Sequence, residues 1–108
     1  MELEEKRAEL EKELGVKVHS YQVTTDKYGV LCAFFKEPTR VVKKMALEKA
    51  ATLGITVAGD FLIETSLILE ETDQRFVSES SEFDALNIGL NLFAQSLVTV
   101  ILGDQKKN

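Results

Sequence analysis

The sequence is poor in the residues that build disulfides, metal sites and catalytic centres, with one cysteine and one histidine among 108 residues. Cys32 has no partner for a disulfide within the chain, and its apolar neighbours predict a buried thiol rather than a redox or nucleophilic group. His19 lacks a second histidine for a metal set or a partner for a triad, so we expect it to pack on the surface or across strands. Asp60 and Glu64 lie one helical turn apart, and we expect this carboxylate pair to be solvated. These scarcities predict a protein that is not an enzyme and holds no metal or cofactor.

Excess positive charge, long apolar runs and glycine-rich motifs are absent as well. The net charge of −5 argues against binding nucleic acid over the whole surface, because such binding needs Lys and Arg to displace counterions from phosphates. The chain has no run approaching the ~18 apolar residues of a membrane span, and its start is rich in Glu and Lys where a signal peptide would be apolar. The six glycines form neither a P-loop nor a dinucleotide-binding fingerprint. We expect a cytoplasmic protein with one domain over residues 1–108.

The first fifteen residues predict a helix. Leu3, Leu10 and Leu14 recur at helical spacing over Glu2 to Leu14, and Gly15 is a natural stop. This apolar stripe is too thin to fold alone. Residues 1–15 therefore form a peripheral helix that lies along the domain, a helix that pairs with a second copy as a short coiled coil, or a frayed tail.

A β-hairpin is predicted next. The strands Val16 to Thr24 and Val30 to Lys36 flank a turn over residues 25–29. The second strand is apolar on both faces, which predicts that it is the more buried of the two. A two-stranded ribbon is marginal in water, so it must pack on helices or gain a further strand from this chain or another.

The junction that follows the second strand is the firmest local prediction. Pro38 ends the strand ladder because it has no N–H, and the Thr39 hydroxyl is placed to cap a helix over Arg40 to Leu53. A core face is expected on this helix at Val42, Met45, Ala46 and Leu53, with Gly54 closing it.

Basic side chains gather at the start of that helix. They form a patch that is a solvated face, a docking surface for an acidic segment, or a phosphate-binding site. Its members are Lys36, Arg40, Lys43 and Lys44.

A second helix is expected over Ile55 to Leu69, with Thr56 as its cap. The acidic stretch over residues 70–81 has no helical period, so we expect a surface loop with one short extended piece at Arg75 to Val77. It lacks the glycine and terminal glutamate of an EF-hand. The core face of the second helix is expected at Val57, Phe61, Leu62, Leu67 and Ile68.

The last predicted helix is long and apolar. Ser81 is placed to cap it, with Asp84 three residues on, and the helical spacing continues from Phe83 to Leu102. Its apolar positions extend beyond one face, so it is either the central helix of the domain or half inside a subunit interface, or both. Residues 103–108 are polar and are expected to fray. The fold class is therefore α+β, with an N-terminal helix, a β-hairpin and then three helices, the last long and apolar.

This order of elements, together with the junction motif Lys36-Glu37-Pro38-Thr39-Arg40 and the helix that carries residues 58–65, resembles the small tail assembly chaperones of tailed phages and prophages. In that group an aromatic or basic strand often leads into Lys-x-Pro-Thr-Arg and then a helix. The looser similarity covers Val18 to about Ile101.

The resemblance implies a non-enzymatic protein that self-associates and keeps the tape-measure protein and tail-tube subunits soluble in the host cytoplasm. Its mechanism would be the reversible covering of apolar helices. The partner-binding residues are then expected on the last helix, with Leu90, Phe93 and Leu97 as anchors, and in the basic patch of Lys36, Arg40, Lys43 and Lys44. We also expect a homo-oligomer. Two alternatives remain open, an acidic DNA-mimic or inhibitor protein and a small-molecule-binding domain.

Overall fold

The computed structural model describes residues 2–107, and side chains over residues 3–98. It has the predicted α+β fold, with an N-terminal helix, an antiparallel hairpin and three further α-helices. The α-helices and strands are α1 (Glu2–Leu14), β1 (Val18–Thr25), β2 (Gly29–Lys36), α2 (Arg40–Thr52), α3 (Ile55–Ser66) and α4 (Asp84–Lys107), and three 3₁₀ turns lie between α3 and α4, namely η1 (Leu69–Glu71), η2 (Gln74–Val77) and η3 (Ser81–Phe83).

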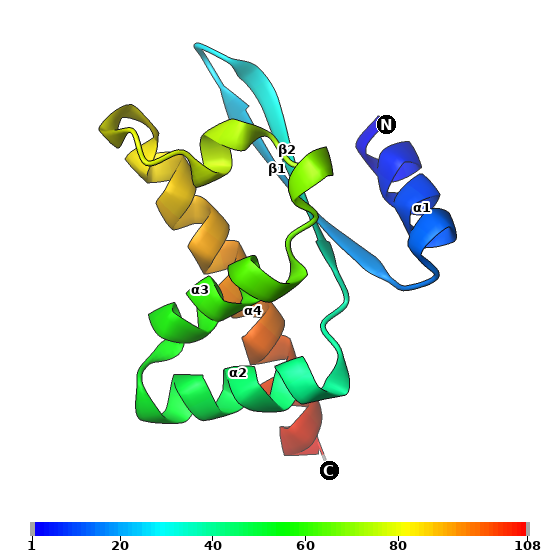
Figure 1. Ribbon diagram of the computed structural model, residues 1–108, viewed down its shortest axis with the longest axis vertical. Helices are drawn as coiled ribbons and strands as arrows, with labels where there is room; N and C mark the ends of the chain where they lie inside the picture. Colours follow the sequence, from blue (N-terminus) through cyan, green and yellow to red (C-terminus); the bar gives the residue numbers. More distant parts are fainter. Residues whose placement is uncertain (1, 108) are drawn as a thin grey trace.

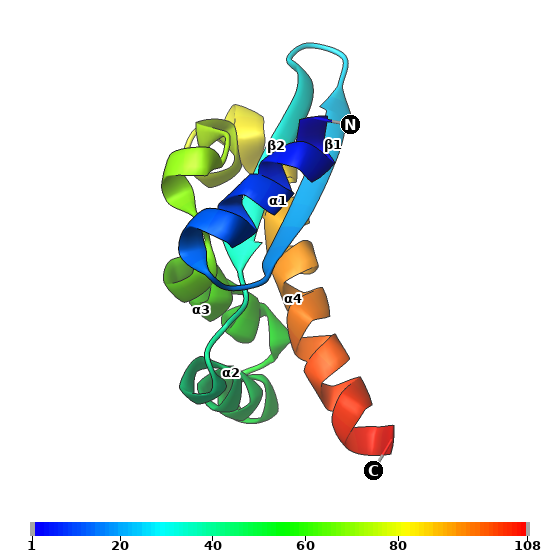
Figure 2. The same ribbon diagram turned by 90° about the vertical axis from the view of Figure 1, so that its right-hand side faces the viewer.

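The hairpin lies between two layers of helix. Figures 1 and 2 show α1 on one face of the two strands and α4 on the other, with α2 and α3 below. The register pairs Val18 with Lys36 and Thr25 with Gly29, whose φ of 73° gives the tight turn that a glycine allows. Because successive side chains in a strand point to opposite faces, the apolar run of β2 supplies both layers. The prediction that β2 is the more buried of the two strands is confirmed.

The larger hydrophobic cluster lies between the hairpin and α4. Leu31, Ala33 and Phe35 of β2 face it, and Tyr21 of β1 stacks on Phe93 with ring centroids 5.0 Å apart. Its other buried members are Ala46, Ala58, Leu62, Phe76, Leu90, Ala94 and Val98.

The smaller cluster joins α1 to the other face of the hairpin. Leu10, Val18, Phe34 and Ile68 are buried in it. The helix Glu2–Leu14 lies along the domain, which is one of the placements that the sequence left open. The Val18 N–H donates to Glu11 Oε2 at 2.9 Å, and this bond, with Arg7 nearby, lowers the pKa of Glu11. α1 is therefore attached to the hairpin by apolar packing and by a hydrogen bond to β1.

The segment after α3 covers the outer edge of β2. The Ile68 N–H donates to the Phe34 carbonyl at 2.8 Å and the Asp73 N–H to the Cys32 carbonyl at 3.0 Å. Thr72 is buried, and its hydroxyl is satisfied there because it accepts from the Phe34 N–H and donates to the Ile68 carbonyl. The expected surface loop is thus partly a substitute for a third strand.

Several predicted boundaries in this half of the chain are wrong. α3 ends at Ser66, not Leu69, because Leu67 forms a bridge with Phe35. The piece expected to be extended at Arg75 to Val77 is the 3₁₀ turn η2, in which the Arg75 N–H donates to the Asp73 carboxylate.

Two of the three predicted helix caps are also wrong, and the third is confirmed. Thr39 Oγ1 accepts from the Val42 N–H, as predicted. Thr56 lies inside the first turn of α3, and Gly54 precedes that helix with a φ of 109°. Ser81 belongs to η3, which leads into α4 at Asp84.

The end of the last helix and some core positions differ from expectation. α4 continues to Lys107 instead of ending at Leu102. Met45, Leu53 and Val57 are exposed, because α2 and α3 turn narrower strips toward the core than their apolar patterns indicated.

Candidate functional site

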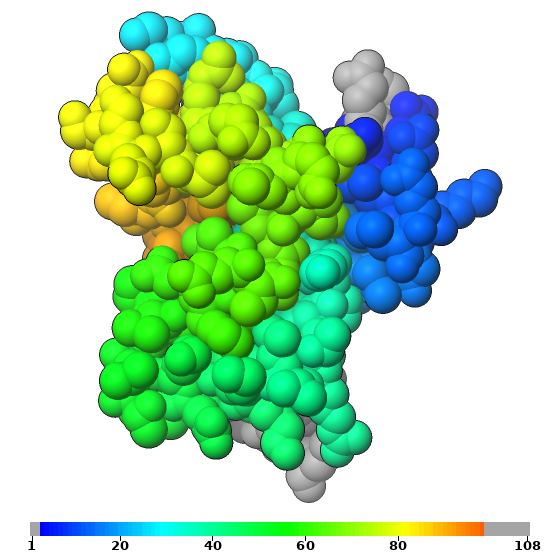
Figure 3. All heavy atoms as spheres, in the orientation of Figure 1, coloured from blue at the N-terminus to red at the C-terminus, as the bar shows by residue number. Residues whose placement is uncertain are grey.

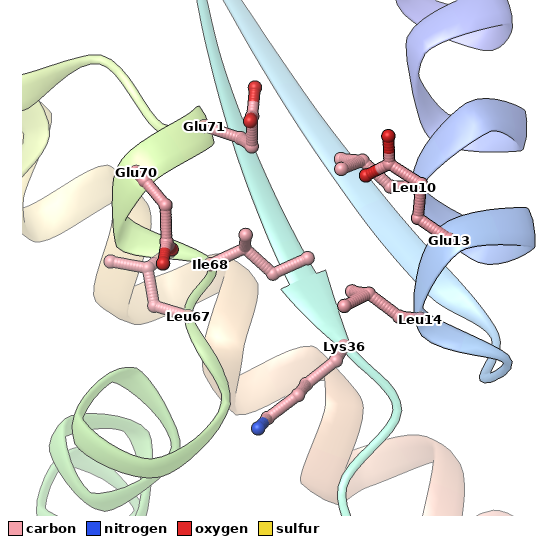
Figure 4. A pocket seen from close by; sticks show the side chains of 8 residues that line it. All are labelled: Leu10, Glu13, Leu14, Lys36, Leu67, Ile68, Glu70 and Glu71. Carbon is pink, nitrogen blue, oxygen red and sulfur yellow. The ribbon is translucent and has the colours of Figure 1, made fainter.

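A groove lies where α1, the end of β2 and η1 meet, and we call it the junction groove (Figure 4). α1 lies beside the groove because Leu10 packs in a cluster with Val18 and Phe34 of the hairpin. The turn at Gly15 then leads the chain from α1 into β1. Figure 3 shows α1 as a ridge beside the rest of the molecule. The hollow has a volume of about 400 Å³ and is lined by Leu10, Glu13, Leu14, Lys36, Leu67, Ile68, Glu70 and Glu71.

The groove has an apolar floor and a partly exposed apolar rim. Leu10 and Leu14 are one helical turn apart, and Figure 4 shows both on the side of α1 that faces Ile68. Leu10 and Ile68 are buried, whereas 46% of Leu14 is exposed. An apolar side chain from a partner could therefore be covered there without any rearrangement of the floor.

Acidic side chains outnumber basic ones along the groove. Lys36 lies at its lower end, and Glu13, Glu70 and Glu71 line the rest (Figure 4). Lys6 Nζ lies 2.8 Å from Glu71 Oε1 and ties α1 to η1 above the groove. The hydrogen bond with Glu71 raises the pKa of Lys6.

A second hollow of about 420 Å³ continues from the groove around Pro38 and shares Leu14 and Lys36 with it. Beside it, Glu37 bridges two bases, with Oε1 2.6 Å from His19 Nε2 and Oε2 2.7 Å from Lys43 Nζ. Partial burial opposes ionisation of Glu37, but the hydrogen bonds from Lys43 and His19 outweigh it and lower the pKa of the carboxyl. The junction is thus held in shape by an ionised carboxylate.

The structure divides the predicted basic patch. Lys36 lines both hollows. Lys43 is partly buried against Glu37. Arg40 and Lys44 are exposed on α2, and neither lines the two hollows. Only Lys36 therefore lies where a partner seated in the groove would meet it.

The predicted anchors on the last helix do not form an exposed face. The expectation is wrong for Leu90, which is 1% exposed in the larger core. Phe93 stacks on Tyr21, and Leu97 packs against the same core, so both are already partly covered within the chain. Among residues 84–98 of α4, the large apolar side chains that are exposed are Ile88 and Leu92, at 61% and 58%.

Chemical groups suited to catalysis or metal binding do not converge in the described structure. His19 contacts Glu37 across the junction, and Asp60 Oδ1 accepts from Asn91 Nδ2 at 2.7 Å. Partial burial, and then the Asp73 carboxylate, raise the pKa of the Cys32 thiol, which disfavours the reactive thiolate. No cluster of metal-ligating side chains is present over the described residues, nor does any described helix have the length and apolarity to cross a membrane.

Several acidic residues form ion pairs with basic residues of the same chain. Arg7 pairs with both Glu4 and Glu11, at 2.7 and 2.9 Å. Glu71, Glu37 and Asp73 likewise have basic partners. These pairs offset part of the acidic charge of the surface.

Comparison with known proteins gave no relative. No family model, no curated protein and no solved structure matches the chain.

Most residues of the junction groove were not predicted as binding residues. Leu14 was assigned to a helix stripe, and Leu67 and Ile68 to a helix that ends before them. The sequence signal that pointed to the site was the change from strand to helix around Lys36 and Pro38.

Proposed function

We propose that the chain is a non-enzymatic, self-associating binding protein of the phage tail assembly chaperone type, acting in the cytoplasm of the host cell. The junction groove supports this proposal most directly. It offers an apolar floor, a partly exposed leucine and charged rims, and among the described residues no reactive group faces it. Such a surface suits an apolar segment that must be covered and later released.

The groove favours an amphipathic helix as its occupant. Helix-in-groove recognition places apolar side chains spaced by three or four residues into a hydrophobic channel. Leu10, Leu14 and Ile68 supply that channel, and the second hollow around Pro38 lengthens it. Because Glu13 and Glu70 line the groove, a helix with basic residues beside its apolar face would be preferred. The proposed partners are the tape-measure protein and tail-tube subunits.

Co-purification tests the proposal. The tagged chain is co-expressed with the tape-measure and tail-tube proteins of the same gene cluster, and soluble partner is measured. We expect capture by the native chain and at least a tenfold loss with Leu14→Glu, which places a carboxylate among Glu13 and Glu70 at the rim. Leu53→Glu is the matched control, because Leu53 is exposed and lines neither hollow. Equal capture by both variants, or no capture by the native chain, would contradict the proposal.

A second candidate is a small-molecule-binding domain, which the volume of the junction groove favours. Binding pockets for small molecules span about 300–1,000 Å³ and combine apolar walls with a few polar groups. At about 400 Å³, with Lys36 and Glu70 among leucines, the groove meets that description. A thermal-shift screen tests it, since a specific ligand raises Tm in the native chain but not in Leu14→Glu.

A further inference from the structure

Among the described residues, no segment covers the outer edge of β1 along most of its length. The sheet has two strands, and residues 68–73 protect the edge of β2. On β1, Glu11 covers the N–H of Val18 only. Figure 2 shows the 3₁₀ segment beside β2 and open space beside β1.

Three residues turn their backbone groups toward that open side. The hydrogen bond from the Glu37 N–H to the Lys17 carbonyl places the odd-numbered residues of β1 toward β2. The N–H and C=O groups of Ser20, Gln22 and Thr24 therefore point outward. Within residues 2–107 no backbone group pairs with them. They form a short row of free donors and acceptors.

This edge also lacks the usual devices that prevent pairing with another strand. Exposed edges are commonly blunted by lysine, proline, inward-pointing charges or bulges. The β1 sequence, Val-His-Ser-Tyr-Gln-Val-Thr-Thr, has no lysine, arginine, carboxylate or proline, in a chain where 29% of residues are charged. The register with β2 runs without a bulge from Val18 to Thr25.

We propose that β1 pairs antiparallel with β1 of a second copy of this chain, so that two hairpins form one four-stranded sheet. Gln22 lies on the two-fold axis and pairs with Gln22 of the partner subunit, while Ser20 pairs with Thr24 of the partner subunit. Each of the three outward residues then both donates and accepts, which gives about six new hydrogen bonds.

A second copy fits this edge better than an unrelated strand because the edge is complementary to itself. The register sets Tyr21 beside Val23 of the partner subunit, twice by symmetry, on the face that packs against α4. Aromatic and β-branched residues make favourable cross-strand pairs. Uncharged strands also meet without the repulsion that two chains of net charge −5 feel elsewhere. The β1 edge would then be the surface through which the chain self-associates. The inference rests on the proposed function, which includes self-association.

Light scattering coupled to size-exclusion chromatography tests the pairing. We expect a dimer at micromolar concentration and a monomer for Gln22→Pro, which removes one outward N–H and leaves the ladder to β2 intact. Gln22→Thr is the matched control and stays dimeric, since it keeps the N–H. A monomeric native chain at ~100 µM would overturn the proposal, as would a dimer that persists in folded Gln22→Pro.

Hydrogen exchange of the native chain gives a second test that needs no variant. The amides of Ser20, Gln22 and Thr24 should be protected at dimer-forming concentration and exchange at least tenfold faster on dilution, while those of Tyr21 and Val23 stay protected throughout. A dimer whose Gln22 amide exchanges freely pairs through another surface and contradicts the proposal. Partner capture through the groove is read separately by Leu14→Glu, so failure of the pairing and failure of the groove are distinguishable.

Discussion

At the scale of single residues, Glu37 decides how the strand-to-helix junction responds to pH. Its folded pKa lies below the ordinary value of 4.5, so its contribution to stability is present above that pH and is lost as pH falls through the lower value. We predict that the urea midpoint of the native chain falls between pH 7 and pH 3 by more than that of Glu37→Gln. Urea unfolding at both pH values measures the difference.

Glu64→Gln is the matched control for this effect. Glu64 is exposed on α3, with no ion pair among the described residues, so its replacement should leave the pH dependence unchanged. An identical pH dependence in the native chain and Glu37→Gln would show that the contacts with Lys43 and His19 contribute nothing to stability.

Gly59 is the second residue whose identity is dictated by its surroundings. A Cβ there would lie 2.7 Å from Asn91 Oδ1. The Asn91 side chain cannot easily move, because it donates to Thr56 and Asp60 and accepts from Gln95. We predict that Gly59→Ala destabilises the fold by about 1–3 kcal/mol in urea unfolding, despite the better helix propensity of alanine.

A double-mutant cycle with Asn91→Ala isolates this contact. Removing the amide removes the clash, so Gly59→Ala should be neutral or stabilising in the Asn91→Ala background. Additive effects of the two changes would mean that the close approach of α3 and α4 does not require glycine.

At the scale of elements, the 3₁₀ segment between α3 and α4 contributes a side chain to the core as well as covering the surface. Phe76 of η2 is buried, and its ring lies 5.8 Å from that of Tyr21. We predict that Phe76→Ala destabilises the protein by about 3–5 kcal/mol, since it leaves a cavity beside β1 and α4. Leu69→Ala in η1, where the leucine is exposed, should change stability by less than about 0.5 kcal/mol. Similar losses for the two variants would contradict this view of the segment.

The hairpin could be predicted from local sequence patterns, whereas the structure of this segment could not. The hairpin and the cap at Thr39 depend on neighbouring residues, and both were predictable. The role of Thr72 depends on Phe34, which is 38 residues away, so a polar residue in an acidic stretch gave no sign that it is buried. The apolar spacing of Leu67 and Ile68 matched a helix, but both residues pair with β2 and the helix ends before them.

The face that α4 turns to the core was not predictable either. Apolar residues lie all round the helix, so spacing alone does not distinguish Leu90 from Leu92. Contacts from other elements make the choice, because Tyr21 occupies the space beside Gly89 and Asn91 bonds to α3. The exposed pair Ile88 and Leu92 is the result.

At the scale of the whole molecule, the junction groove exists only because three separated parts of the chain meet. α1, the end of β2 and η1 each contribute one wall. The sequence indicated that Lys36 lies at an important junction but not that Leu14 and Leu67 would line one groove with it. Binding sites formed by tertiary packing leave little periodic signal in a single sequence.

The central claim is that the groove covers an apolar helix of a partner protein. A photo-reactive phenylalanine analogue at position 14, in chain co-expressed with the proposed tail proteins, tests it most directly, with the analogue at position 53 as control. We predict that irradiation joins position 14 to an amphipathic helix of a partner, identified by mass spectrometry, and that position 53 gives at most a tenth of that product. Equal yields from the two positions, or none from position 14, would contradict the claim.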